Sequence, residues 1–142
     1  MISLKNSLFI VLVLAITSCS NSLSETELNQ LNGYWEIEKV RFPDGQTKEY
    51  TINETIDFIK LDSLEGFRKK MKPTFEGTYV TSDDAELFTI FKKEDTYMIQ
   101  YKATDTEWIE HLIAVSANSF TVRTSENVSY TYKRYEPIQI TE

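Results

Sequence analysis

The sequence predicts an all-β fold, a small antiparallel up-and-down β-barrel of about eight strands. From Leu31 onward, apolar and aromatic residues alternate with polar ones, which is the pattern of half-buried strands. Short polar turn clusters interrupt this pattern, and the later ones lie roughly 9 to 12 residues apart, as in consecutive hairpins. A sandwich is the alternative architecture. Because closure removes exposed strand edges, the up-and-down order favours the barrel.

Ten segments have strand character, and some of the earlier ones are close enough to merge: 33–42, 47–52, 55–61, 67–72, 75–81, 86–92, 96–103, 107–116, 119–124 and 128–135. Ahead of them, Glu25 to Leu31 is predicted to form one helical turn with Ser24 as its N-cap. We expect the barrel to span residues 31–136 and to be followed by a C-terminal tail at 137–142.

Residues 1–18 have the pattern of a signal peptide, and we exclude them from the fold. An unbroken apolar run from Leu8 to Ile16 follows the positive charge of Lys5. This run is too short to cross a bilayer, which takes about 20 apolar residues. It ends in Ile16-Thr17-Ser18-Cys19, which resembles the lipobox of lipoproteins from diderm bacteria. Cys19 is the only cysteine in the chain, and a chance cysteine after an ordinary secretory signal is the alternative.

The lipobox resemblance implies cleavage before Cys19, with lipid such as palmitate on that cysteine. Residues 19–30 are then the lipidated cysteine and a tether. Attachment by two or more acyl chains is stable, so the lipid would hold the protein to a membrane of the cell envelope. Ser20, rather than an aspartate, follows the cysteine, and by the same resemblance this favours the outer membrane.

The composition narrows the range of partners. The formal net charge is −7, and removal of Lys5 with the signal peptide makes it one unit more negative. An acidic chain is a poor partner for nucleic acid, whose phosphates require clustered Lys and Arg. With a single cysteine there is no intrachain disulfide, so the core alone must stabilise the fold.

The segment Leu31-Asn32-Gly33-Tyr34-Trp35-Glu36-Ile37 resembles the opening of a lipocalin-type barrel, and over residues 28–136 the chain resembles the small lipocalin-like (calycin-type) lipoproteins of diderm bacteria. The resemblance implies that Trp35 plugs one end of the barrel and that a basic residue of the last strand stacks across it. Arg134 is the candidate, and Lys133, which points the opposite way, is the alternative. Gly33 permits an unusual φ or a close backbone approach.

The sequence departs from a typical lipocalin in two ways. It is shorter and lacks the disulfides of that superfamily. The first strand also changes phase, because Trp35 and Ile37 share one face while Val40 lies on the other. A bulge near Glu38 or Lys39 would reconcile the two faces.

The resemblance implies that the barrel binds a small hydrophobic or amphipathic ligand. Eight Tyr, eight Phe and two Trp supply more aromatic residues than a small core needs. Residues that share one face of a central strand are the candidate lining of a pocket: Phe88, Ile90, Tyr97, Ile99, Tyr101, Ile109, His111 and Ile113. A one-residue slip would reverse the face of the strand that contains Phe88. For His111, the simpler alternative is a partly buried histidine without contact to a ligand.

Motifs for catalysis are missing from the sequence, so we predict no enzyme, no cofactor and no metal site. Asp83, Asp84 and Glu86 are better explained as a solvated turn than as a calcium loop. The basic run 68–72 is best explained as edge protection on an exposed strand, with contact to anionic lipid headgroups as the alternative. The second candidate function is a protein-interaction module, such as an inhibitor of a basic envelope-attacking enzyme like lysozyme, because an acidic surface attracts a cationic partner.

Overall fold

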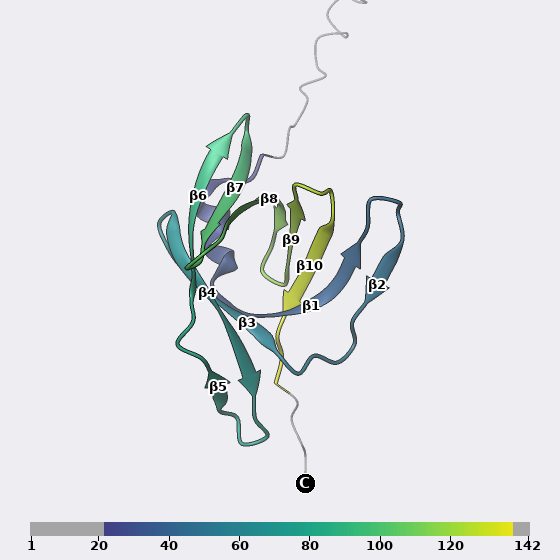
Figure 1. The fold of residues 1–142 in the computed structure, drawn as a ribbon, viewed down its shortest axis with the longest axis vertical. Coiled ribbons are helices and arrows are strands. Elements are labelled where there is room, and N and C mark those ends of the chain that lie inside the picture. The colour runs from purple at the N-terminus through teal and green to yellow at the C-terminus, as the bar shows by residue number, and fades with distance from the viewer. Residues whose placement is uncertain (1–21, 138–142) are drawn as a thin grey trace, which may run out of the picture.

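The computed structural model describes residues 22–137, which form a closed antiparallel β-barrel (Figure 1). Eight strands make the wall in the order β10-β9-β8-β7-β6-β4-β3-β1, and β1 pairs with β10 to close it. Two short strands are additional, β2 on β1 and β5 on β4. The predicted fold class, an all-β up-and-down barrel, is confirmed.

The strands are β1 (Gly33–Arg41), β2 (Thr47–Glu49), β3 (Ile56–Asp62), β4 (Glu65–Pro73), β5 (Tyr79–Thr81), β6 (Glu86–Lys93), β7 (Thr96–Lys102), β8 (Glu107–Val115), β9 (Ser119–Thr124) and β10 (Ser129–Arg134). Each predicted segment overlaps one of them, and β3, β4 and β6 extend one or two residues beyond the predicted bounds. β5 is shorter than predicted, because the preceding residues form a turn in which the N–H of Thr74 donates to the carbonyl of Thr78 at 2.9 Å.

A helical turn precedes the barrel and packs into it. Its two parts are α2 (Glu25–Leu28) and η2 (Asn29–Leu31), as predicted. The backbone N–H of Ser24 donates to the carboxylate of Glu27 at 2.7 Å, which fixes the start of the turn. Leu28 and Leu31 are 0% and 1% exposed. Leu28, which the prediction places in the tether, is therefore part of the core.

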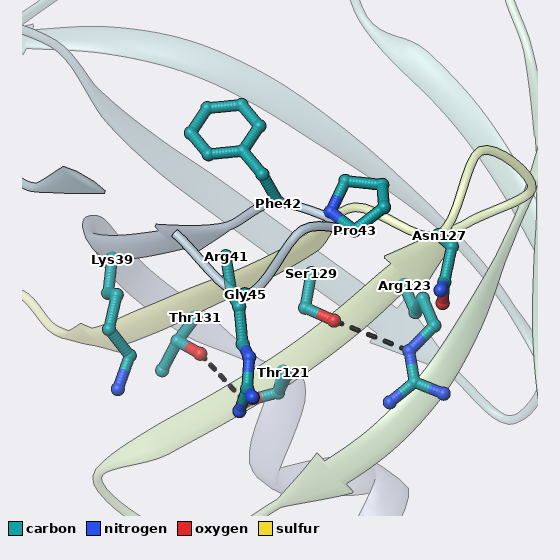
Figure 2. Close-up of a pocket in the computed structure, with 10 residues that line it drawn as sticks. All are labelled: Lys39, Arg41, Phe42, Pro43, Gly45, Thr121, Arg123, Asn127, Ser129 and Thr131. Atoms are coloured by element: carbon teal, nitrogen blue, oxygen red, sulfur yellow. Dashed lines mark hydrogen bonds between the residues drawn. The ribbon is translucent and has the colours of Figure 1, made fainter. Parts of the chain in front are cut away.

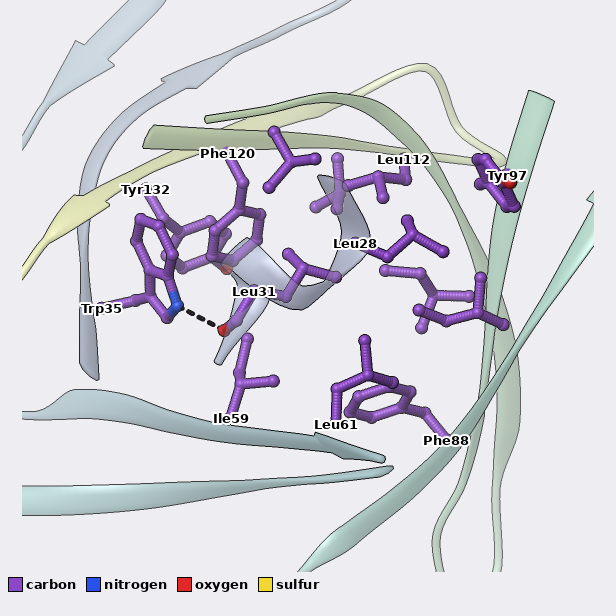
Figure 3. Packing of buried hydrophobic residues seen from close by; sticks show 14 of the residues in the cluster. Leu28, Leu31, Trp35, Ile59, Leu61, Phe88, Tyr97, Leu112, Phe120 and Tyr132 are labelled. Atoms are coloured by element: carbon purple, nitrogen blue, oxygen red, sulfur yellow. Dashed lines mark hydrogen bonds between the residues drawn. The ribbon is translucent and has the colours of Figure 1, made fainter. Parts of the chain in front are cut away.

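The core lies inside the barrel and is built from inward-facing residues of seven wall strands and the helical turn (Figure 3). Leu28 and Leu31 occupy its centre, surrounded by Trp35, Leu61 and Phe120 among others (Figure 3). Apolar burial of this kind contributes about 25 cal/mol per Å². The helical turn thus completes the centre of the core.

The first strand contains the predicted bulge. Its pairing with β10 shifts between Ile37 and Lys39, so Glu38 is the extra residue. The shift turns Val40, which is 5% exposed, toward the interior on the same side as Trp35. One residue of bulge therefore lets a strand of changing phase keep its apolar side chains inside.

The predicted signal peptide 1–18, the lipidation site Cys19 and most of the C-terminal tail lie outside the described residues. Within residues 22–137, no helix has the length and apolar character needed to cross a membrane.

Candidate functional site

One end of the barrel is closed by Trp35 and Arg134. Trp35 is 0% exposed, and its indole N–H donates to the carbonyl of Leu31 at 2.8 Å. The guanidinium carbon of Arg134 lies 3.7 Å from the centre of the Trp35 ring, a cation–π contact. Gly33 has φ +119°, and a Cβ there would lie 2.6 Å from Arg134 Nη1. Both the conformation and the close approach therefore require glycine.

Arg134 also ties three backbone segments together. Its guanidinium donates at 2.7 to 3.0 Å to the carbonyls of Gln30, Asn32 and Ala117. The alternative, Lys133, pairs with Glu36 instead, at 3.1 Å. The prediction that Arg134 covers Trp35 agrees with this geometry.

The interior also holds charged and hydroxyl groups, called here the polar cluster: Asp57, Arg68, Lys70, Tyr101, Glu110 and Tyr132. Asp57 and Arg68 are 3% and 7% exposed, and two oxygen–nitrogen contacts of 3.0 and 3.1 Å join them. Lys70 Nζ lies 2.7 Å from Asp57 Oδ1, the oxygen that also accepts from Arg68 Nε, and the Lys70 side chain is 62% exposed. The polar cluster therefore reaches solvent at Lys70.

The ionisation of Asp57 follows from these neighbours. Burial disfavours its charged form, but the attraction and hydrogen bonds of Arg68 and Lys70 outweigh burial. The pKa of Asp57 consequently lies below its usual range, so the carboxylate is charged at neutral pH.

Aromatic rings connect the polar cluster to the closed end. Trp35 meets Phe120 edge to face at 4.8 Å, and Phe120 stacks on Tyr132 at 4.6 Å. The guanidinium of Arg68 lies over the Tyr132 ring at 4.8 Å. Arg68 also donates a long hydrogen bond of 3.5 Å to the Tyr101 hydroxyl. A continuous chain of ring contacts therefore leads from the apolar packing at Trp35 to the charged side chain of Arg68.

Glu110 is the unusual member of the polar cluster. Its Oε2 is a buried side-chain oxygen that has no hydrogen-bond partner among the described residues. Burial raises the pKa of Glu110, and the charge of Arg68 only partly opposes this rise. Next to it on β8, Trp108 is half-buried and stacks on Tyr101 at 4.9 Å. An unpaired buried oxygen beside an aromatic platform is a place where a donor group can bind.

The structure divides the predicted lining residues into two groups. Five of them are buried in the core: Phe88, Ile90, Tyr97, Ile99 and Tyr101. The other three, Ile109, His111 and Ile113, face the outside, so their predicted inward orientation is wrong. Ile109 and Ile113 are each 41% exposed. Strand β8 instead turns Trp108, Glu110 and Leu112 inward, and a bulge after Leu112 adds Val115 to that face.

Sequence reasoning missed the charged residues of the interior. Arg68 was assigned to a protective exposed edge, but β4 lies inside the sheet between β3 and β6, and Arg68 points inward. The sequence does not single out Asp57, because this residue stands in a typical strand pattern. Its register opposite Lys70 is the signal that would have found it, since a basic residue directly across the ladder indicates a pair.

No protein family matches the sequence, and no curated protein matches it. Similar solved structures include a lipocalin-like protein from Bacteroides uniformis ATCC 8492, with a TM-score of 0.47 and 8% identity over 75% of this chain and 99% of that chain. Apocrustacyanin C1 has a TM-score of 0.45 and 10% identity over 79% of this chain. Lobster apocrustacyanin A1 has a TM-score of 0.45 and 11% identity over 78% of this chain. The chain spans 64% of the length of each apocrustacyanin.

Three features of the chain's own geometry are lipocalin-like. The wall closes between β1 and β10, the Gly33-x-Trp35 opening lies at the start of the first strand, and Arg134 of the last strand covers Trp35. The chain is a lipocalin-like β-barrel.

Proposed function

We propose that this protein is a lipid-anchored, lipocalin-like lipoprotein that binds a small amphipathic molecule through the polar cluster. The observation that carries the proposal is the buried, unpaired Oε2 of Glu110 close to the buried cation Arg68. A buried charge is costly, and an apolar pair of similar volume is often as stable as a buried ion pair. Recognition of a ligand therefore explains the buried charged groups of the polar cluster better than stability does.

The polar cluster supports a proposal for the chemistry of the ligand. Its polar end needs a hydrogen-bond donor for Glu110 and an acceptor for Arg68 or the Tyr101 hydroxyl. Its apolar part needs a surface, and Trp108 and Tyr130 are half-buried aromatics at the edge of the core. Since Trp35 closes one end and Leu28 and Leu31 occupy the centre of the core, the proposed ligand would enter from the side where Lys70 meets solvent.

The proposed anchor would keep this site close to a membrane. Helix α2 begins at Glu25, so only a few residues separate it from Cys19. Even fully extended, such a segment spans about 20 Å. A molecule that partitions into lipid would therefore be concentrated near the barrel. The pattern at Cys19 and Ser20 favours the outer membrane as the site of attachment.

Native mass spectrometry of the full chain, purified in mild neutral detergent, tests ligand binding. We expect a bound small molecule in the wild type and its loss in Glu110→Gln, which removes the charge but keeps the shape. Glu107→Gln is the matched control, because Glu107 lies on the same strand and is exposed. No bound molecule in the wild type, together with no displaceable binding of a fluorescent fatty acid, would refute the proposal.

A protein partner is the second candidate, and the turns at the end of the barrel away from Trp35 favour it. Each of four turns there carries an acidic residue: Asp44, Glu76, Asp105 and Glu126. An acidic rim steers a cationic protein toward the barrel mouth. If charge reversal in these turns abolishes inhibition of a basic envelope-attacking enzyme such as lysozyme, while Glu110→Gln leaves it unchanged, this function replaces the first.

A further inference from the structure

The outer wall of the barrel carries a hollow of about 470 Å³ where β1, β10 and β9 run side by side (Figure 2). The turn between β1 and β2 borders it with Phe42, Pro43 and Gly45, and the turn between β9 and β10 borders it with Asn127. The rest of its lining is basic or carries a hydroxyl group: Lys39, Arg41, Thr121, Arg123, Ser129 and Thr131. The hollow lies outside the barrel and shares no residue with the polar cluster.

Strand register arranges these six residues in two rows across three strands. In one row Arg41 pairs with Ser129, and Ser129 pairs with Arg123. In the neighbouring row Lys39 pairs with Thr131, and Thr131 pairs with Thr121. Because adjacent strands lie about 4.8 Å apart, the two arginines flank Ser129 at a distance that their long side chains can bridge.

Hydrogen bonds hold the hydroxyl groups in place between the cations. Arg123 Nε donates to Ser129 Oγ at 3.3 Å, and the hydroxyls of Thr121 and Thr131 lie 3.1 Å apart. The side chains of Lys39, Arg41 and Arg123 extend toward the same side in Figure 2. Three positive charges thus converge on a surface that offers further hydrogen-bond donors.

The charge of this hollow is not balanced by the protein. None of its lining residues is acidic. Within residues 22–137, neither Lys39, Arg41 nor Arg123 forms an ion pair. Glu49 stands opposite Lys39 on β2, but it does not line the hollow. In a chain with a net charge of −7, three cations thus line one concave site that has no acidic lining residue, and a bound anion would neutralise them.

We infer that this hollow is a second ligand site, which binds the phosphate group of an organic phosphate. Two guanidinium forks can each give paired hydrogen bonds to phosphate oxygens, and Lys39 adds a point charge. The Ser129 hydroxyl donates to the oxygen that lies between the arginines. The volume falls in the range of about 300–1,000 Å³ that holds small-molecule ligands, so the site has room for the group that carries the phosphate.

Titration of the ¹⁵N-labelled full chain with inorganic phosphate, in neutral detergent, tests the site. We expect saturable shifts of the amide signals of Thr121, Ser129 and Thr131, which weaken at high ionic strength. The double variant Arg41→Gln/Arg123→Gln should weaken binding by about tenfold or more, because each charged hydrogen bond contributes about that factor. Lys39→Gln should weaken binding less, and its matched control Lys93→Gln, at an exposed lysine away from the hollow, should leave it unchanged.

Two results would overturn the inference: shifts spread over surface lysines without saturation, or equal phosphate affinity in the double variant and the wild type. Titration with dihexanoylphosphatidylglycerol below its micelle concentration distinguishes the sources of phosphate. Tighter binding than inorganic phosphate, lost in the double variant, identifies a lipid headgroup. Equal or weaker binding identifies a soluble organic phosphate.

Discussion

Replacing Arg134 by alanine should lower the free energy of unfolding by about 3 kcal/mol. The cation–π contact with Trp35 accounts for about 1 kcal/mol of this loss. The hydrogen bonds to the carbonyls of Gln30, Asn32 and Ala117 account for about 2 kcal/mol together. This is less than the sum for three buried charged hydrogen bonds, because Arg134 is only partly buried and water can replace part of what is lost.

Urea denaturation of the variant, followed by circular dichroism, measures this loss, and the melting temperature should fall by about 10 °C. The unfolding free energy of Arg134→Lys should lie between those of the wild type and Arg134→Ala. An ammonium group keeps the charge, but it lacks the planar fork that reaches three carbonyls. The neighbouring Lys133→Ala is the control, since its ion pair with Glu36 lies on the outer wall and contributes about 1 kcal/mol at most. Equal destabilisation by Arg134→Ala and Lys133→Ala would refute the assigned role of Arg134.

Three further predictions follow from the core, the anchor and the polar cluster. Trp35→Ala should cost about 3–5 kcal/mol, and iodide should leave Trp35 fluorescence unquenched in a folded Trp108→Phe variant; full quenching would contradict its burial. Cys19→Ala should release the protein from membranes and end metabolic labelling with palmitate, and continued labelling would exclude Cys19 as the lipidation site. Because burial raises the pKa of Glu110, its stabilising contribution is present below the ordinary glutamate pKa and is lost as the pH rises through its folded pKa. The wild type should therefore gain unfolding free energy relative to Glu110→Gln on acidification toward the ordinary glutamate pKa, and a constant difference in urea denaturation would contradict the burial of that carboxyl.

Most of the wall could be predicted from the sequence, because each strand is an alternating run and each turn is polar. The bulge in β1 was also predictable, since Trp35 and Val40 cannot share a face without an extra residue between them. The contact of Arg134 with Trp35 followed from the lipocalin resemblance and not from alternation. The wall and the bulge depend on local patterns, which a single sequence records directly.

The orientation of β8 could not be predicted, because both of its faces contain apolar residues. Ile109 and Ile113 make one face the more apolar, yet Trp108 and Leu112 are the residues that face the core. The inward face also carries Glu110, whose charge is attracted by Arg68 of β4, a strand that β8 does not pair with. The hollow on the outer wall and the polar cluster in the interior likewise depend on register across several strands, which alternation within one strand does not fix.

The closed end of the barrel and the polar cluster differ in the residues that build them. Around Trp35, the helical turn packs Leu28 and Leu31 into the core. Around Arg68, the barrel keeps charges that an apolar pair would replace without loss of stability. Removing one partner of the Asp57–Arg68 pair would strand the other charge, so single substitutions there report folding and binding together. Glu110 also affects stability, because burial raises its pKa and Arg68 attracts its charge, but its Oε2 has no partner among the described residues. Comparing ligand binding with urea denaturation of Glu110→Gln therefore separates a loss of recognition from a loss of stability.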